Sequence, residues 1–143
     1  MNRIVSIFLT FVIIFATVSL SACNSTEMKK YYAERDNYIT ATGSVSHIAY
    51  DEENEKLFIS FADLNPEFND NTFKIAGQNY LIVKSRSVQQ KLKLGVEVEF
   101  ITAPRYFGDG YAMPIVAMTI DGEVLLAFNE GFENLQVYLK NKT

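Results

Sequence analysis

The sequence predicts a mainly β fold: a small β-barrel of about five to six strands, with a short helix between strands three and four and a C-terminal helix. Three observations predict this class. From Tyr38 onward apolar and polar residues alternate with a period of two, which is typical of strands with one buried face. The pair Asp121-Gly122 joins two alternating segments and is a strong hairpin signal. The segment from Asn129 has the helical spacing of apolar residues instead.

The chain is long enough for one domain and carries too little positive charge to bind nucleic acid. It has 143 residues and a formal net charge of -4. Hydrophobic residues make up 48% of the chain, and part of these hydrophobic residues lies at the N-terminus. A mildly acidic domain lacks the cations that displace counterions from phosphate. The single cysteine, Cys23, excludes both a disulfide framework and a cysteine metal cluster.

The N-terminus has the layout of a secretory signal. Arg3 precedes an apolar run over residues 4–20, which leads into Leu20-Ser21-Ala22-Cys23. These four residues resemble the lipobox of bacterial lipoproteins. The resemblance implies that the thiol of Cys23 receives a diacylglycerol, with palmitate among its acyl chains, and that cleavage falls just before this cysteine. Two or three acyl chains hold a protein at a bilayer durably, since each buried methylene contributes roughly 0.8 kcal/mol.

This N-terminus divides the chain into three parts: a signal peptide at residues 1–22, a lipidated tether at 23–37 and a folded domain at 38–143. The protein is then expected at the cell membrane, lipid-anchored on its extracytoplasmic face. The tether is short, so the domain should lie close to the bilayer. The alternative is an uncleaved membrane helix, but the apolar run, at about 1.5 Å per residue, would barely cross a hydrocarbon core.

The first two strands are predicted on either side of an acidic turn. The first is long, roughly Tyr38–Tyr50, and its apolar phase slips beside Gly43, which predicts a bulge or a sharp coil. The turn covers Asp51–Glu55, and residues 57–62 alternate as the second strand. A polar loop, Asp63–Asn71, follows.

The third strand is predicted to begin at Phe73, turn at residues 76–79 and continue through the apolar run Tyr80–Val83. A short helix follows, because Ser87 and Gln90 fit a capping box. Leu94-Gly95 is expected to end that helix. The alternation over residues 96–100 then predicts a fourth strand with one solvated face.

A hairpin and a helix complete the domain. Strands are predicted at residues 116–120 and, after the Asp-Gly turn, at Val124, Leu126 and Phe128. Asn129 is expected to cap the C-terminal helix. The apolar stripe of this helix is predicted to consist of Phe132, Leu135, Tyr138 and Leu139.

This order of elements resembles an OB fold, in which a long first strand coils at a glycine and a helix lies between strands three and four. The resemblance is one of pattern, covers roughly Tyr38 to Phe128 and rests on no motif of a particular family. It implies a small barrel whose loops flank a ligand face. An SH3-like barrel, or another small, partly open barrel with a packed helix, is the alternative.

The connection between the last two long strands is the strongest candidate binding site. Arg105, Tyr106, Phe107 and Tyr111 lie on this one glycine-containing loop. Aromatic faces beside a cation make a platform for peptide, sugar or protein. In an OB fold this connection flanks the usual ligand face. The alternative is that these aromatic rings cover the open end of the barrel.

Other candidates for chemistry are weaker. His47 is the only histidine, and no serine or cysteine near a recognisable motif would serve as its nucleophile. The loop Asp63–Asn71 is rich in oxygen ligands, but Phe68 and Lys74 stand where a calcium loop needs glycine and a closing glutamate. No catalytic residue, metal or cofactor is therefore predicted.

These observations predict a lipid-anchored extracytoplasmic binding or interaction module without catalysis of its own. Its expected partners are the membrane, through the lipid on Cys23, and a protein, peptide or envelope glycan at the aromatic loop. The alternative is a structural accessory subunit of a membrane or envelope complex. An enzyme acting on the cell envelope is the third hypothesis.

Overall fold

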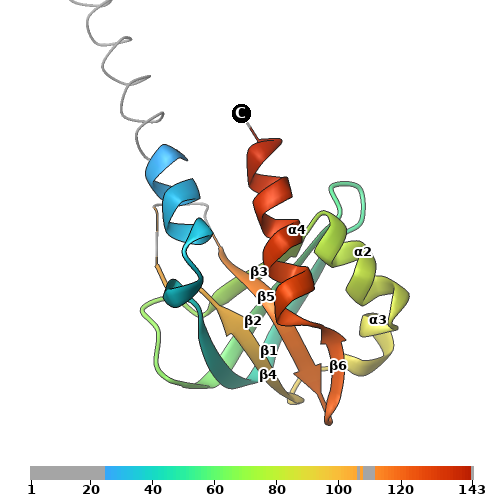
Figure 1. Ribbon diagram of the computed structural model, residues 1–143. Coiled ribbons are helices and arrows are strands. Elements are labelled where there is room, and N and C mark those ends of the chain that lie inside the picture. Colours follow the sequence, from blue (N-terminus) through green and yellow to red (C-terminus); the bar gives the residue numbers. More distant parts are fainter. Residues whose placement is uncertain (1–24, 106, 108–111, 143) are drawn as a thin grey trace, which may run out of the picture.

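The sheet of this protein closes on itself. In a computed structural model, which describes residues 25–105, 107 and 112–142, six strands run in the order β3-β2-β1-β4-β5-β6, and pairing of β3 with β5 completes a ring (Figure 1). The predicted fold class is confirmed: the protein is mainly β, with helices between strands three and four and at the C-terminus. The elements are η1 (Arg35–Asn37), β1 (Ile39–Asp51), β2 (Lys56–Asn65), β3 (Thr72–Ala76), α2 (Gln78–Ser85), α3 (Val88–Lys91), β4 (Glu97–Thr102), β5 (Met113–Ile120), β6 (Glu123–Leu126) and α4 (Phe128–Lys140).

Strand β1 lies between β2 and β4 in the sheet and pairs antiparallel with both. The predicted bulge is confirmed: the register against β2 shifts between Thr42 and Ser44 and again after Val45. Gly43 lies at the first shift, where a Cβ would be 2.8 Å from the Cβ of Phe61. Glycine therefore lets β1 coil closely over β2. Strand β2 runs on to Asn65, further than predicted.

The core fills the inside of the ring with three phenylalanines at its centre. The ring of Phe61 stacks on that of Phe100 at a centroid distance of 4.6 Å, and Phe73 meets Phe100 edge-on at 4.9 Å. All three are 0–1% exposed. Since they come from β2, β3 and β4, their burial joins strands that are far apart in the sequence.

Residues Tyr80–Val83, predicted to extend the third strand, belong instead to helix α2, so that prediction is wrong. Gly77 has a φ of +60°, and the chain turns there from β3 into the helix. Tyr80 and Val83, one helical turn apart, face the core, whereas Leu81 is 39% exposed. Periodicity alone cannot assign an apolar run of this length to a strand or a helix.

Helix α3 lies where the short helix was predicted, but the predicted capping box is wrong. Ser87 has a left-handed backbone conformation, and its side chain makes no capping hydrogen bond. The helix ends at Lys91, before the predicted end at Leu94-Gly95. Val88 and Leu92 are buried in the core, so tertiary packing stabilises this short helix.

The last hairpin turns at Asp121-Gly122, as predicted, but its second strand differs from the prediction. Strand β6 ends at Leu126, and Val124 is 55% exposed while Leu125 is buried. The register between β5 and β6 shifts near Met118, and the expected inward alternation is lost there. The predicted alternation of Val124 with Leu126 is therefore wrong, because only Leu126 of the two is buried.

Helix α4 begins at Phe128, so the prediction that Phe128 ends a strand and that Asn129 caps the helix is wrong. The side chain of Asn129 instead accepts a hydrogen bond from Arg35 at 2.9 Å. The predicted apolar stripe is confirmed. Its buried members are Phe132, Leu135 and Leu139, and Tyr138 is partly buried.

The segment predicted as a tether packs on the domain. Residues 25–33 are helical, and Tyr32 is buried in a second apolar cluster with Leu135 and Leu139 of α4. Figure 1 shows this helix in blue and α4 in red, extending from the sheet in the same direction. Among the described residues, no helix has both the length and the apolar character needed to span a membrane.

Candidate functional site

The candidate binding loop begins at Arg105, beside the helix over residues 25–33. The guanidinium carbon of Arg105 lies 5.4 Å from the ring centroid of Tyr31 and 4.7 Å from that of Phe107. Arg105 also forms an ion pair with Glu27. The cation predicted to serve a ligand is thus already engaged by the chain's own N-terminal helix, although 46% of its side chain is exposed.

Phe107 completes this contact between loop and helix. Its ring centroid lies 5.4 Å from those of both Tyr31 and Tyr32, and each pair is edge-on. Edge-to-face pairs contribute about 0.5–1.5 kcal/mol each beyond the area they bury. Arg105 and Phe107 therefore hold the N-terminal helix against the sheet, which is a role that the sequence analysis does not anticipate.

Two of the predicted loop residues, Tyr106 and Tyr111, lie outside the described residues, and so does the lipidation candidate Cys23. The structure brings Arg105 and Phe107 together. The predicted roles of the other three residues stay predictions.

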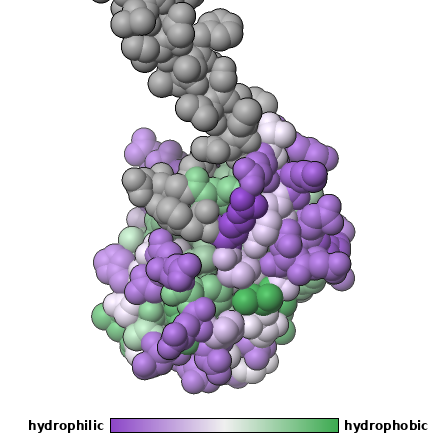
Figure 2. Space-filling model, turned by 90° about the vertical axis from the view of Figure 1, so that its left-hand side faces the viewer, coloured by the Kyte–Doolittle hydropathy of each residue, from purple (hydrophilic) through white to green (hydrophobic). Residues whose placement is uncertain are grey.

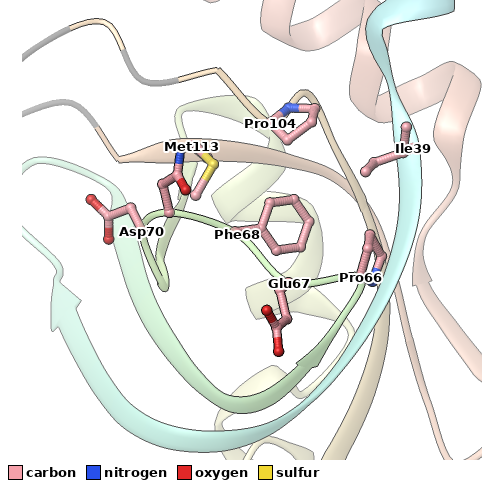
Figure 3. Close-up of a pocket in the computed structure, with 8 residues that line it drawn as sticks. Ile39, Pro66, Glu67, Phe68, Asp70, Pro104 and Met113 are labelled. Carbon is pink, nitrogen blue, oxygen red and sulfur yellow. The ribbon is translucent and has the colours of Figure 1, made fainter.

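A pocket of about 350 Å³ opens beside this loop. It lies between the β2–β3 loop and the two ends of the β4–β5 connection, with Phe68 near its centre (Figure 3). Figure 2 shows the side of the molecule at the left of Figure 1, where hydrophobic surface lies among hydrophilic side chains. The volume is at the small end of the range for ligand pockets. The lining residues are Ile39, Pro66, Glu67, Phe68, Asn69, Asp70, Pro104 and Met113.

The polar groups of this pocket are carboxylates and an amide. One oxygen of the Asp70 carboxylate is already hydrogen-bonded within the chain: Oδ1 accepts from the backbone N–H of Thr72 at 3.0 Å. Glu67 is exposed, and its side chain points away from Pro104 in the close-up (Figure 3). Phe68 is anchored edge-on against Phe73 at 5.5 Å. A pocket with an apolar floor and carboxylates at its rim fits a ligand side chain that has an apolar stem and a positively charged end.

Burial keeps two tyrosines at the helix–sheet junction neutral. The hydroxyl of Tyr38 donates to the backbone carbonyl of Tyr32 at 2.7 Å, and burial strongly raises the pKa of Tyr38. Burial also raises the pKa of Tyr31, against the opposing effect of Arg105. Both phenols therefore stay protonated at neutral pH and do not serve as bases.

The remaining sequence candidates do not form a site within the described residues. His47 is exposed on β1, opposite Ser60. Asp63 and Asn65 belong to β2, so the expected polar loop begins after them. No group of three or more histidine, cysteine, aspartate or glutamate side chains in the part of the chain that the structure describes is arranged to hold a metal ion.

A second hollow, of about 300 Å³, lies on the outer face of β4, β5 and β6 where α4 begins. Val124 at its edge is 55% exposed. Phe128 is half-buried there, beside Ile101 and Ala117. This shallow groove is apolar and has no charged group besides Glu99 among its lining residues.

Comparison with known proteins finds no protein family, no curated protein and no solved structure that matches this chain. The site is thus defined by its own residues alone.

Sequence reasoning misses the partners of the candidate loop. Tyr31 and Tyr32 are adjacent aromatic residues on a helix-prone segment, and that adjacency was the available signal. Phe68, Met113 and Ile39 come together only because the ring closes, and nothing local in the sequence indicates it.

Proposed function

We propose that this protein is a lipid-anchored extracytoplasmic binding module without catalytic activity of its own. It is held at the membrane through a lipid on Cys23 and binds a protein or peptide partner at the pocket beside the Arg105 loop. The observation that carries the binding role is the pocket around Phe68, which combines an apolar floor with carboxylates at its rim.

The packing of the N-terminal helix supports this arrangement. Tyr32 is 4% exposed against α4, and Arg105 and Phe107 contact the same helix. Since the helix is described from residue 25 onward, a lipid on Cys23 would be attached close to a packed element. The domain would then be held near the bilayer in a restricted orientation, which raises its effective concentration toward membrane partners.

The Arg105 loop contributes the rest of the proposed contact surface. Arg105 and Phe107 position the start of the loop, and their exposed portions provide a cationic and an aromatic group near the pocket. A peptide that places a basic side chain with an apolar stem in the pocket would extend across Arg105 and Phe107. An envelope glycan that stacks on the same aromatic rings is the other ligand this loop would accept.

Site-specific photocrosslinking in intact cells tests this proposal. A photoreactive amino acid replaces Glu67 at the pocket rim, and the matched control replaces Glu53 in the β1–β2 turn, which is also exposed. We expect a discrete adduct from position 67 and none from position 53. Equal adducts from both positions, or none from position 67, contradict the pocket as the binding site.

The groove on the outer sheet face favours a second candidate function, a structural accessory subunit. Val124, Phe128 and Ile101 would be covered permanently in such a complex. Sedimentation of a Cys23→Ser chain discriminates the two functions: a monomer supports the binding module, and self-association that is lost in Val124→Lys supports the subunit.

A further inference from the structure

A small cleft lies beside the contact between the helix over residues 25–33 and α4. Met28 and Tyr32 line one side, and Leu135, Tyr138, Leu139 and Lys142 line the other. Lys74, Ala112 and Pro114 form the floor on β3 and β5. We refer to it as the lysine cleft. Its walls are mostly apolar, and its charged lining residues are both cations, Lys74 and Lys142.

Within the described part of the chain, Lys74 has no carboxylate partner. It is half-buried in the middle of β3, and no ion pair or hydrogen bond joins its ammonium group to any described residue. Burial, followed by the charges of Lys142 and Lys56, lowers the pKa of Lys74 from 10.5 to about 8. At neutral pH the group is still mostly protonated, so a buried positive charge faces other positive charges. Buried charges are normally paired with an opposite charge, so this environment of Lys74 favours an anionic ligand.

The other polar groups of the cleft are donors as well. The ammonium of Lys142 lies 4.7 Å from the ring centroid of Tyr138. The hydroxyl of Tyr138 is buried and has no hydrogen-bond partner among the described residues. Lys74, Lys142 and Tyr138 all line this small space, and none of its described lining residues is an aspartate or a glutamate.

The size of the cleft restricts its ligand. Its free volume is about 50 Å³, which has room for a few waters or one phosphate group but not for a sugar or a nucleotide. The apolar walls at Met28, Leu135 and Leu139 would adjoin whatever the phosphate group is attached to. A headgroup phosphate with acyl chains beyond it matches this pattern of charge and apolar surface.

The position of the cleft also favours a lipid. Met28 lies near the start of the described helix, and Lys142 lies just past the end of α4. Figure 1 shows these two helix ends on the same side of the molecule. A lipid on Cys23 would direct that side toward the bilayer. This last step rests on the proposed function, whereas the charge and the volume of the cleft do not.

We propose that the lysine cleft is a phosphate-binding site in which Lys74 and Lys142 hold the headgroup phosphate of a membrane phospholipid. Protonated Lys74 would donate from the floor and Lys142 from the rim. A second anchoring contact would then fix the orientation of the domain on the bilayer.

The first experiment needs no lipid on Cys23. The full chain with Cys23→Ser, in a maltoside detergent, is titrated with inorganic phosphate at constant ionic strength, and the thermal midpoint reports binding. We expect phosphate to raise the midpoint, and Lys74→Met and Lys142→Met each to weaken the affinity about tenfold. Lys140→Met, which removes an exposed charge at the end of α4, should change the affinity less than about twofold. No rise of the midpoint, or an equal loss in all three variants, overturns the site.

The second experiment separates the two sources of phosphate. The rate at which an amine-reactive reagent modifies Lys74, relative to exposed Lys93, is measured by mass spectrometry in phosphatidylglycerol nanodiscs and in phosphate-free maltoside micelles. We expect nanodiscs to slow the modification of Lys74 at least about fivefold relative to Lys93, because a bound anion holds the amine protonated. Equal relative rates in the two media overturn the lipid as the ligand.

Failure of the phosphate site can be distinguished from failure of lipid attachment at Cys23. Lys142 lies beyond the last helix, so Lys142→Met tests the site even if Lys74→Met unfolds the chain. Because the phosphate titration uses a chain without the lipidation site, a negative result there concerns the cleft alone.

Discussion

At position 131 a side chain of any size would collide with the sheet. A Cβ built on Gly131 lies 1.9 Å from the carbonyl oxygen of Val116, so α4 contacts β5 through bare backbone. The carbonyl of Gly131 also accepts a hydrogen bond from the buried amide of Asn79 at 2.8 Å, which joins α4 to α2. One glycine thereby sets the distance between the C-terminal helix and the ring.

Replacing this glycine is therefore expected to destabilise the protein. Glycine to alanine within a helix normally stabilises by about 1 kcal/mol. Here Gly131→Ala should instead lower the free energy of unfolding by about 2–3 kcal/mol, because α4 must move away from β5. Urea denaturation measures the change, with Glu133→Ala on the exposed face of α4 as the control. A gain in stability for Gly131→Ala would contradict the close approach.

The pKa of Lys74 predicts a dependence of stability on pH. Its pKa of about 8 in the folded state is below the ordinary 10.5, so the unfolded chain binds more protons between these values. The cost of burying the charge is therefore present in full below about pH 8 and is relieved as the pH rises toward 10.5.

Lys74→Met removes that cost. In chloride buffer without phosphate, we expect Lys74→Met to be more stable than the wild type at pH 7 and this advantage to shrink steadily by pH 10. The two chains differ only at Lys74, so a difference between their pH profiles reports on this residue. Free energies of unfolding from urea denaturation at each pH provide the measurement. Parallel pH profiles would show that Lys74 is not buried as described.

How accurately each helix or strand was predicted depended on how much of its structure is determined by neighbouring residues in the sequence. The hairpin at Asp121-Gly122 and the strand β4 were predictable, because turn chemistry and alternation are local signals. Helix α2 was not, because its apolar run faces the core from a helix only when Gly77 turns the chain. The binding loop at Arg105 was recognisable by composition, whereas the helix that contacts it lies far away in the sequence.

The contact between the N-terminal helix and the loop leads to a prediction about local dynamics. Phe107→Ala removes both edge-to-face contacts with Tyr31 and Tyr32, and the docking of the helix should weaken by about 1–3 kcal/mol. Hydrogen exchange of the amides in residues 25–33 should therefore accelerate at least about fivefold, while exchange in β1 and β4 stays unchanged.

Leu94→Ala is the matched control, because Leu94 is 68% exposed and distant in the sequence from the helix. It should leave exchange in residues 25–33 unaltered. Faster exchange throughout the sheet in Phe107→Ala would show instead that this ring belongs to the global core.

The whole molecule combines a ring-shaped sheet with two helices that extend from it in one direction (Figure 1). The three phenylalanines lie at the centre of the core, and the pocket around Phe68 and the lysine cleft share no lining residue. In the proposed function the lipid supplies attachment, the cleft supplies orientation and the pocket supplies recognition. Each task belongs to a different group of residues, so each can be removed by itself.

The proposed function depends first on the attachment of a lipid to Cys23. Intact-mass spectrometry of the protein purified from the membrane fraction of its host tests this attachment most directly. We expect a chain that begins at Cys23 and carries the added mass of a diacylglyceryl group, and a Cys23→Ser chain that lacks this mass. A wild-type chain that retains residues 1–22 and an unmodified Cys23 would overturn lipid attachment.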